Sequence, residues 1–188
     1  MKRLMTRIMP YGRSLGLALV VSAALSAPDM AMAASGQDRA WTNVGSVGVV
    51  KDTDLTLVKL DGSRARLAAG TVSGTIRYNV TATEGLFLGP DKTLTVRFYK
   101  PDNFSVVTAR LWSVDGTTGA HTTLMFFDST PYAPVAGFQT QSVTVNLPSD
   151  FDFNDKAYFI EVVLYRTRNA QGTLFGDPRI ELLKILAQ

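Results

Sequence analysis

An alternation of apolar and polar residues between Thr71 and Thr83 (TVSGTIRYNVTAT) most limits the folds open to this chain. The large apolar residues share one parity with Gly74: Val72, Ile76, Tyr78 and Val80. The other parity holds threonine, serine, arginine and asparagine. Successive side chains of a β-strand point to opposite faces, so the pattern predicts a strand with one buried face and one face in water. A helix, with its period of 3.6 residues, would spread both sets around its circumference.

Similar segments recur along the chain. Asp61-Gly62 lies between two alternating segments and predicts a hairpin turn, because glycine adopts positive φ without steric cost. Further short strands, separated by turns rich in Gly, Pro, Asn and Asp, are predicted over residues 93–99, 106–114, 122–127, 141–147 and 157–166. Residues 179–186 follow Asp177-Pro178, which is compatible with the start of a helix or with a closing strand. A strand is the prediction, because the other strands provide a sheet for it to join.

These strands predict an all-β fold, a two-layer antiparallel β-sandwich. A jelly-roll-like topology is expected first, and an immunoglobulin-like sandwich is the alternative. The sandwich is expected to span residues 43–188 as a single domain. It follows a flexible leader at residues 34–42, whose Trp41 is expected to fold back onto the domain. Six residues are predicted to be buried: Ile76, Val80, Val96, Leu111, Ile160 and Val162. Three arginines are predicted on outer faces: Arg77, Arg97 and Arg110.

The first 33 residues have the order of a secretory signal peptide. Lys and Arg residues precede an apolar run at residues 14–27, and Ala31-Met32-Ala33 supplies the small residues of a cleavage site. The apolar run is shorter than the ~20 residues that cross a membrane. We therefore expect cleavage after Ala33 and export from a bacterial-type cell, to the periplasm or the exterior. No later apolar run approaches spanning length, so no membrane-spanning helix is expected in the mature chain.

Removal of the signal peptide changes the charge balance. The whole chain has 19 Lys and Arg against 16 Asp and Glu, and residues 1–33 contain four of the basic residues and one acidic residue, which leaves 15 of each sign. Because the mature chain lacks a basic surplus, nucleic acid is not expected as a partner. The sequence contains no cysteine, so the exported domain has no disulfide bonds and its stability must come from burial.

Two predicted strands carry arginine and an aromatic residue on the parity opposite the core. Arg110 and Trp112 form one such pair, and Arg97 and Tyr99 form the other. An aromatic face offers apolar area to a sugar or a protein, and arginine and aromatic residues commonly anchor interfaces. These four residues are the predicted ligand-binding residues, with carbohydrate among the expected ligands. The alternative is cross-strand packing, with arginine stems over rings and the charges paired to a neighbour such as Glu161.

The segment 150–155 (DFDFND) has oxygen-bearing side chains in close succession: Asp150, Asp152, Asn154 and Asp155. Calcium prefers six to eight oxygen ligands, so this segment is a candidate calcium loop, and no other cofactor is expected. Such a loop has glycine at its sixth position, where this chain has Asp155. The alternative is a polar loop anchored in the core by Phe151 and Phe153.

His121 is the only histidine in the chain. A lone histidine without cysteine cannot complete the usual zinc ligand sets, and no G-x-S-x-G motif accompanies it. The sequence therefore favours an exported, non-catalytic binding or interaction module of unknown ligand. The alternative is a structural subunit of a surface or extracellular assembly, in which sheet edges pair between chains. A hydrolase built around His121 is the least expected function, so the chain is not expected to be an enzyme.

Overall fold

The computed structural model describes residues 40–82, 90–147, 151–169 and 171–187. The predicted signal peptide, its cleavage site and residues 34–39 of the leader lie outside the described residues. Within these ranges the elements are β1 (Ala40–Val44), η1 (Gly45–Val47), β2 (Val49–Val50), η2 (Asp52–Asp54), β3 (Val58–Asp61), β4 (Arg64–Leu67), β5 (Ser73–Val80), β6 (Asp91–Tyr99), β7 (Ser105–Asp115), β8 (His121–Asp128), β9 (Phe138–Asn146), β10 (Lys156–Arg166) and β11 (Arg179–Ala187). Over the described ranges, no helix is long and apolar enough to cross a membrane.

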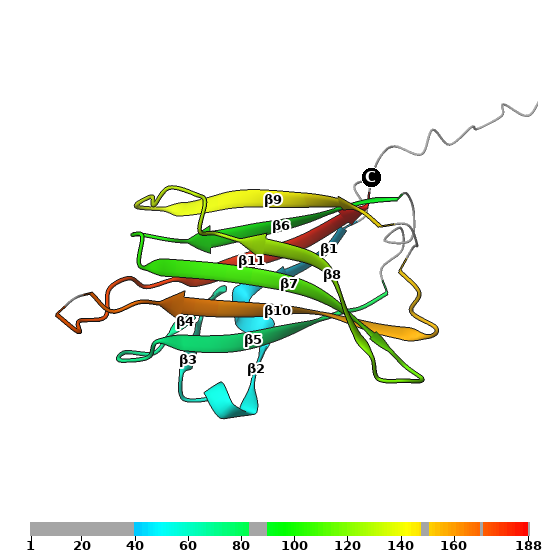
Figure 1. Cartoon of the computed structure of the whole chain (residues 1–188), viewed down its shortest axis with the longest axis horizontal. Coiled ribbons are helices and arrows are strands. Elements are labelled where there is room, and N and C mark those ends of the chain that lie inside the picture. The colour runs from blue at the N-terminus through cyan, green and yellow to red at the C-terminus, as the bar shows by residue number, and fades with distance from the viewer. Residues whose placement is uncertain (1–39, 83–89, 148–150, 170, 188) are drawn as a thin grey trace, which may run out of the picture. The chain divides into compact units, whose positions relative to one another are not determined.

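The strands form two antiparallel sheets (Figure 1). Sheet A has the order β3-β4-β11-β6-β9, with β1 also paired to β11, and sheet B has the order β2-β5-β10-β7-β8. From β4 to β7 the chain alternates between the sheets, and after the β7–β8 hairpin it alternates again up to β11. The strands from β4 to β11 thus build two four-stranded layers in the jelly-roll order. The predicted jelly-roll-like β-sandwich is confirmed, and the immunoglobulin-like alternative is not adopted.

The core lies between the two sheets. All six residues predicted to be buried belong to it. The ring of Phe98 in sheet A contacts the ring of Phe127 in sheet B edge-on, with centroids 5.4 Å apart. Every second residue of β5, β7 and β10 is buried, as period-two alternation requires. The three arginines predicted on outer faces occupy the other parity and lie on the solvent-facing sides of their sheets.

The C-terminal segment is a strand, as predicted, and it is central in sheet A. β11 pairs with β6 on one side and with β4 and β1 on the other. Residues 40–42, predicted as the end of a flexible leader, belong to β1, and Trp41 is only 5% exposed.

The predicted hairpin joins β3 to β4, but Asp61 pairs with Arg64, so the loop consists of Gly62 and Ser63. Gly62 has a φ of 58°, which explains the glycine at this position.

A buried lysine ties a loop to one end of the sandwich. Lys100 directly follows β6 and is 2% exposed. Its Nζ donates hydrogen bonds to the carbonyl oxygens of Ser129 at 3.0 Å, Thr130 at 3.1 Å and Tyr132 at 2.7 Å. The ammonium group therefore has three neutral acceptors in place of a carboxylate, which satisfies its donors inside the protein.

A buried arginine, Arg166, also connects separate segments by donating hydrogen bonds to backbone carbonyl groups. Arg166, at the end of β10, donates from Nε to the carbonyl of Thr71 at 2.5 Å and from Nη2 to that of Ala68 at 2.7 Å. Its Nη1 donates to the carbonyl of Gly176 at 3.1 Å. One guanidinium thus joins the segment before β5 to the segment before β11.

Candidate ligand-binding surface

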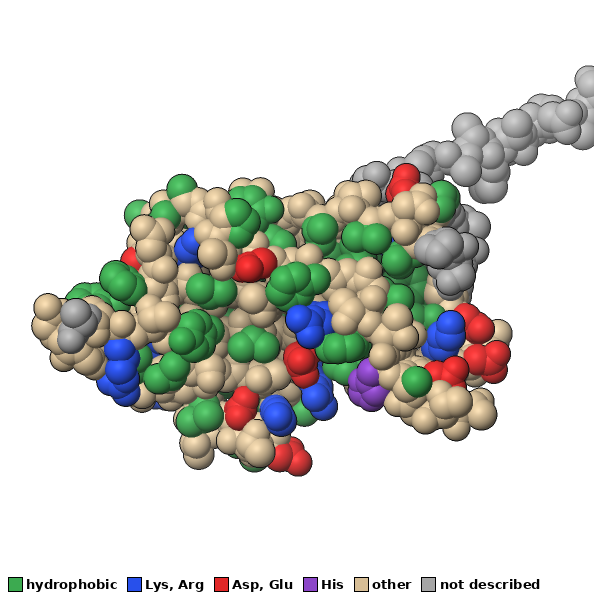
Figure 2. All heavy atoms as spheres, in the orientation of Figure 1, with side chains coloured by type: hydrophobic (Ala, Val, Ile, Leu, Met, Phe, Trp, Pro, Cys, Tyr) green, Lys and Arg blue, Asp and Glu red, His purple; other side chains and the backbone are tan. Residues whose placement is uncertain are grey.

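The solvent-facing side of sheet B carries two of the predicted ligand-binding residues. Strand pairing arranges its side chains in rows that cross the sheet. One row runs across all five strands: Val49, Arg77, Glu161, Arg110 and Phe126. The adjacent row crosses four strands: Asn79, Phe159, Trp112 and Thr123. We call these two rows the sheet B surface. Figure 2 shows hydrophobic, cationic and acidic side chains interspersed on this side of the domain.

Two aromatic rings form the middle of the sheet B surface. The ring centroids of Trp112 and Phe159 are 6.5 Å apart, and their planes differ by 26°. Both side chains are partly exposed. His121, at the exposed start of β8, packs edge-on against both rings, at 6.0 Å from Trp112 and 6.1 Å from Phe159. Because the two large rings lie on neighbouring strands and are nearly parallel, they present adjacent apolar area on one face.

Two arginines flank the rings, and only one of them, Arg77, forms an ion pair. The Cζ of Arg77 lies 5.3 Å from the Phe159 centroid, and its Nε and Nη2 donate to Oε2 of Glu161 at 3.1 Å and 3.0 Å. The Cζ of Arg110 lies 5.1 Å from the Trp112 centroid and 4.9 Å from that of Phe126. Glu161 lies opposite Arg110 in register but its ion pair is with Arg77. Within the described ranges no carboxylate forms an ion pair with Arg110.

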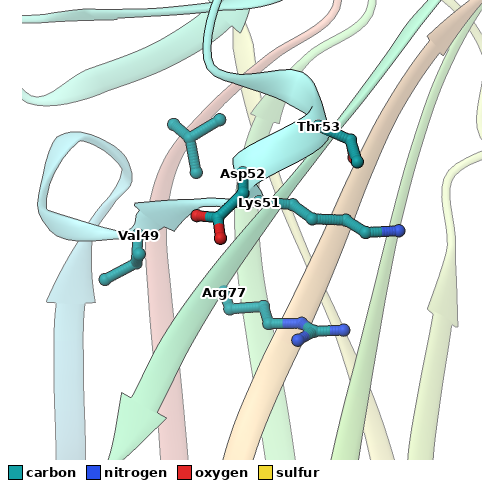
Figure 3. A pocket seen from close by; sticks show the side chains of 6 residues that line it. Val49, Lys51, Asp52, Thr53 and Arg77 are labelled. Carbon is teal, nitrogen blue, oxygen red and sulfur yellow. The ribbon is translucent and has the colours of Figure 1, made fainter.

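A shallow pocket of about 390 Å³ adjoins this surface at β2 and β5. Lys51 and Arg77 extend in the same direction along it, as Figure 3 shows. Nearby, Asp54 accepts a hydrogen bond from the backbone N–H of Thr75 at 2.8 Å. Partial desolvation opposes ionisation of Asp54, but hydrogen bonds from Thr53 and Thr75 and the charge of Lys51 hold its pKa below the usual value. The pocket therefore has two cations, Lys51 and Arg77, in its lining and an ionised carboxylate, Asp54, close by.

The other predicted pair lies on the solvent-facing side of sheet A. Arg97 and Arg64 both donate to the carboxylate of Glu181, Arg97 at 2.5 Å and Arg64 at 3.3 Å. Both guanidinium groups also lie over the ring of Phe138, which packs against Tyr99 at 5.6 Å. The structure brings Arg110 into contact with Trp112, whereas Arg97 and Tyr99 both contact Phe138. The two predicted pairs lie on different sheets. On sheet A, Arg97 and Arg64 both form an ion pair with Glu181.

The candidate calcium segment is described from residue 151 onward, and Asp150 lies outside the described residues. Oδ1 of Asp152 accepts hydrogen bonds from the backbone N–H groups of Asn154 at 3.1 Å and Asp155 at 3.4 Å, which closes a local turn. Phe151 is buried and contacts Tyr158 at 4.7 Å. In the described part of the chain, no three His, Asp or Glu side chains are grouped closely enough to hold a metal ion.

Sequence reasoning did not single out Phe126 and Phe159 as site residues. Both occupy the solvent-facing parity of a strand, the same signal that identified Trp112. Phe159 was obscured because β10 is apolar on both faces, so the alternation does not show which apolar residues face outward. Arg77 was assigned to an outer face but not to a site, because its place beside Phe159 depends on the pairing of β5 with β10.

No family model matches this chain, and no curated protein matches it. Among solved structures, the C-terminal CBM6 module of LamC, a laminarinase from the marine Zobellia galactanivorans, is 12% identical, with a TM-score of 0.42, over 78% of this chain and 98% of that one. A carbohydrate-binding module of Cellvibrio mixtus lichenase 5A, in complex with cellotriose, is 12% identical with a TM-score of 0.42, over 79% and 97% of the chains. A chain in the structure of infectious bursal disease virus, Gx strain, is 10% identical, with a TM-score of 0.41, over 81% of this chain and 32% of that one. At these identities and TM-scores the similarities carry no argument about the function of this chain.

Proposed function

We propose that the mature chain is an exported, non-catalytic binding module and that its sheet B surface binds carbohydrate. The observation that carries this proposal is the pair of nearly parallel, partly exposed rings of Trp112 and Phe159. A pyranose ring has a face of C–H groups that packs on an aromatic ring, and hydroxyl groups around its edge that need hydrogen-bond partners. The rings would supply the apolar contact and the flanking arginines the donors.

The arrangement around the rings supports this proposal. Charged groups form stronger hydrogen bonds than neutral ones, and Arg77, Arg110 and Glu161 lie in the row next to the two rings. Rings on paired strands of a sheet are held by the backbone ladder, so little order is lost when a ligand binds. His121 adds a third ring edge to the same surface.

The test compares aromatic truncations on the two outer faces. Trp112→Ala is expected to weaken binding to a polysaccharide by roughly tenfold or more, because one aromatic stacking contact is removed. Tyr99→Ala, on sheet A, is the matched control and should bind as the wild type does. Binding would be measured by isothermal titration calorimetry against a panel of soluble polysaccharides, and circular dichroism would confirm that both variants fold. Binding that survives Trp112→Ala but not Tyr99→Ala would contradict the proposed surface.

One observation favours the second candidate, a structural subunit of an assembly. β9 is at the edge of sheet A, and its sequence FQTQSVTVN contains no charged residue and no proline. Natural proteins usually protect an edge strand with such residues, because its free backbone groups can pair with another chain. A concentration series in light scattering separates the two functions. A binding module stays monomeric, whereas a subunit forms larger species as the concentration rises.

A further inference from the structure

Arg110 has an unusual position on the sheet B surface. Its guanidinium lies over two rings, those of Trp112 and Phe126, and Phe126 is 44% exposed. Aromatic faces attract the cation but do not replace the strong acceptors that a guanidinium prefers. Within the described ranges, the side chain of Arg110 forms no ion pair and no hydrogen bond to another side chain. Five N–H donors therefore remain for a ligand or for water.

The neighbouring carboxylates are committed to other groups. Both hydrogen bonds from Arg77 to Glu161 end on Oε2, so Arg77 balances the charge of Glu161. Asp128, on the neighbouring edge strand β8, accepts hydrogen bonds on Oδ1 from the backbone N–H and the hydroxyl of Thr130 at 2.7 Å and 2.6 Å. Asp54 on the far edge of the sheet lies near Lys51. The positive charge of Arg110 is thus left uncompensated beside the aromatic pair.

We infer that the carbohydrate bound by the sheet B surface is acidic, and that Arg110 recognises a carboxylate or sulfate group on it. This inference rests on the proposed function. A planar guanidinium binds either group through two parallel hydrogen bonds, which a neutral sugar cannot match. The contacts with Trp112 and Phe126 hold the guanidinium in place, so little side-chain entropy is lost on binding. A sugar ring packed on Trp112 would have its acidic substituent within reach of Arg110.

The experiment uses polymers that differ only in their acidic groups. Polygalacturonate is compared with its fully methyl-esterified form, and dextran sulfate with dextran, by isothermal titration calorimetry. We expect one acidic polymer to bind more tightly than its neutral counterpart. Arg110→Gln should weaken that binding by roughly 10- to 100-fold, the range for a hydrogen bond to a charged group. Binding of the neutral counterpart should weaken by a smaller factor, because glutamine still donates to a hydroxyl group. A preference for polygalacturonate would identify a carboxylate as the bound group, and a preference for dextran sulfate would identify a sulfate.

The matched control is Arg64→Gln on sheet A, because Arg64 also lies over a ring, at 4.7 Å from the Phe138 centroid. An equal loss in Arg64→Gln would indicate a general attraction for polyanions and overturn the inference. Equal binding of acidic and neutral polymers, or an acidic preference that survives Arg110→Gln, would also overturn it. If any of these results overturns the inference, neutral binding that is lost in Trp112→Ala would still support the proposed function. A lack of binding to every polymer would remove both.

Discussion

Replacement of Lys100 by methionine tests whether the buried ammonium holds the end of the sandwich together. The variant keeps the unbranched stem but leaves three carbonyl groups without the ammonium donor. Ser129 is fully buried, and its carbonyl keeps the backbone N–H of Tyr132 as a donor at 3.1 Å, but the loss of its hydrogen bond from the charged ammonium costs about 1.5–3 kcal/mol. Thr130 is exposed and Tyr132 partly so, and water can replace the donor there, at about 0.5–1.5 kcal/mol for each net bond lost. Burial of the methionine end offsets part of this, and we expect a total loss of about 2–4 kcal/mol.

Urea denaturation, followed by the fluorescence of Trp41 and Trp112, measures this loss. With a typical slope of about 1–3 kcal/mol per molar urea, the midpoint should fall by roughly 1–2 M while the slope stays the same. Lys59→Met is the control, because Lys59 is exposed on β3 and its replacement should change stability by no more than about 0.5 kcal/mol. If the two variants unfold at the same urea concentration, the hydrogen bonds from Lys100 to the three carbonyl groups do not stabilise the fold and the reasoning is wrong.

Two further predictions concern acid stability and export. Burial raises the pKa of Glu181, but hydrogen bonds and charges from Arg97 and Arg64 outweigh it and hold the pKa below its usual value of 4.5. Because the pKa of Glu181 is lower in the folded than in the unfolded protein, its ion pairs stabilise the fold fully above pH 4.5, and this stabilisation is lost as the pH falls through the folded pKa. The difference in urea midpoint between wild type and Glu181→Gln should therefore shrink from pH 7 to pH 3. A difference that stays constant would contradict this. For export, the intact mass of the secreted product should correspond to a chain that begins at Ala34, and a product that retains residues 1–33 would show that the segment is an anchor.

The alternation along single strands was sufficient to predict the sandwich and most of its core. Leu94, Val96 and Phe98 are buried because their parity is apolar and the intervening residues are polar, which only a strand with one covered face satisfies. The strand at residues 179–186 was predicted for a different reason, the presence of a sheet to join. Its central position was not predictable, because it depends on pairings with residues more than a hundred positions earlier.

The site is less predictable than the core, because the pairing of strands that are distant in the sequence brings its residues together. Arg110 and Trp112 were recognised because they lie two residues apart on one strand. Phe159 and Arg77 join them only through the pairing of β10 with its two neighbours. Burial of Lys100 was also hidden, since its nearest acceptor, the carbonyl of Ser129, is 29 residues away in the sequence. A lysine before Pro101 has the appearance of an exposed turn residue until the loop after β8 folds over it.

The central position of β11 has a consequence for when the domain is able to fold. Without β11, sheet A separates into the β3–β4 hairpin, the β6–β9 pair and the isolated strand β1, because β11 is the strand that pairs with each of them. All of its pairings span long stretches of sequence, and such non-local contacts form slowly because loop closure must precede them. The growing chain therefore cannot complete sheet A until residues 179–187 have been synthesised. Until then β1, β4 and β6 lack the strand that joins them, so sheet A stays incomplete during synthesis.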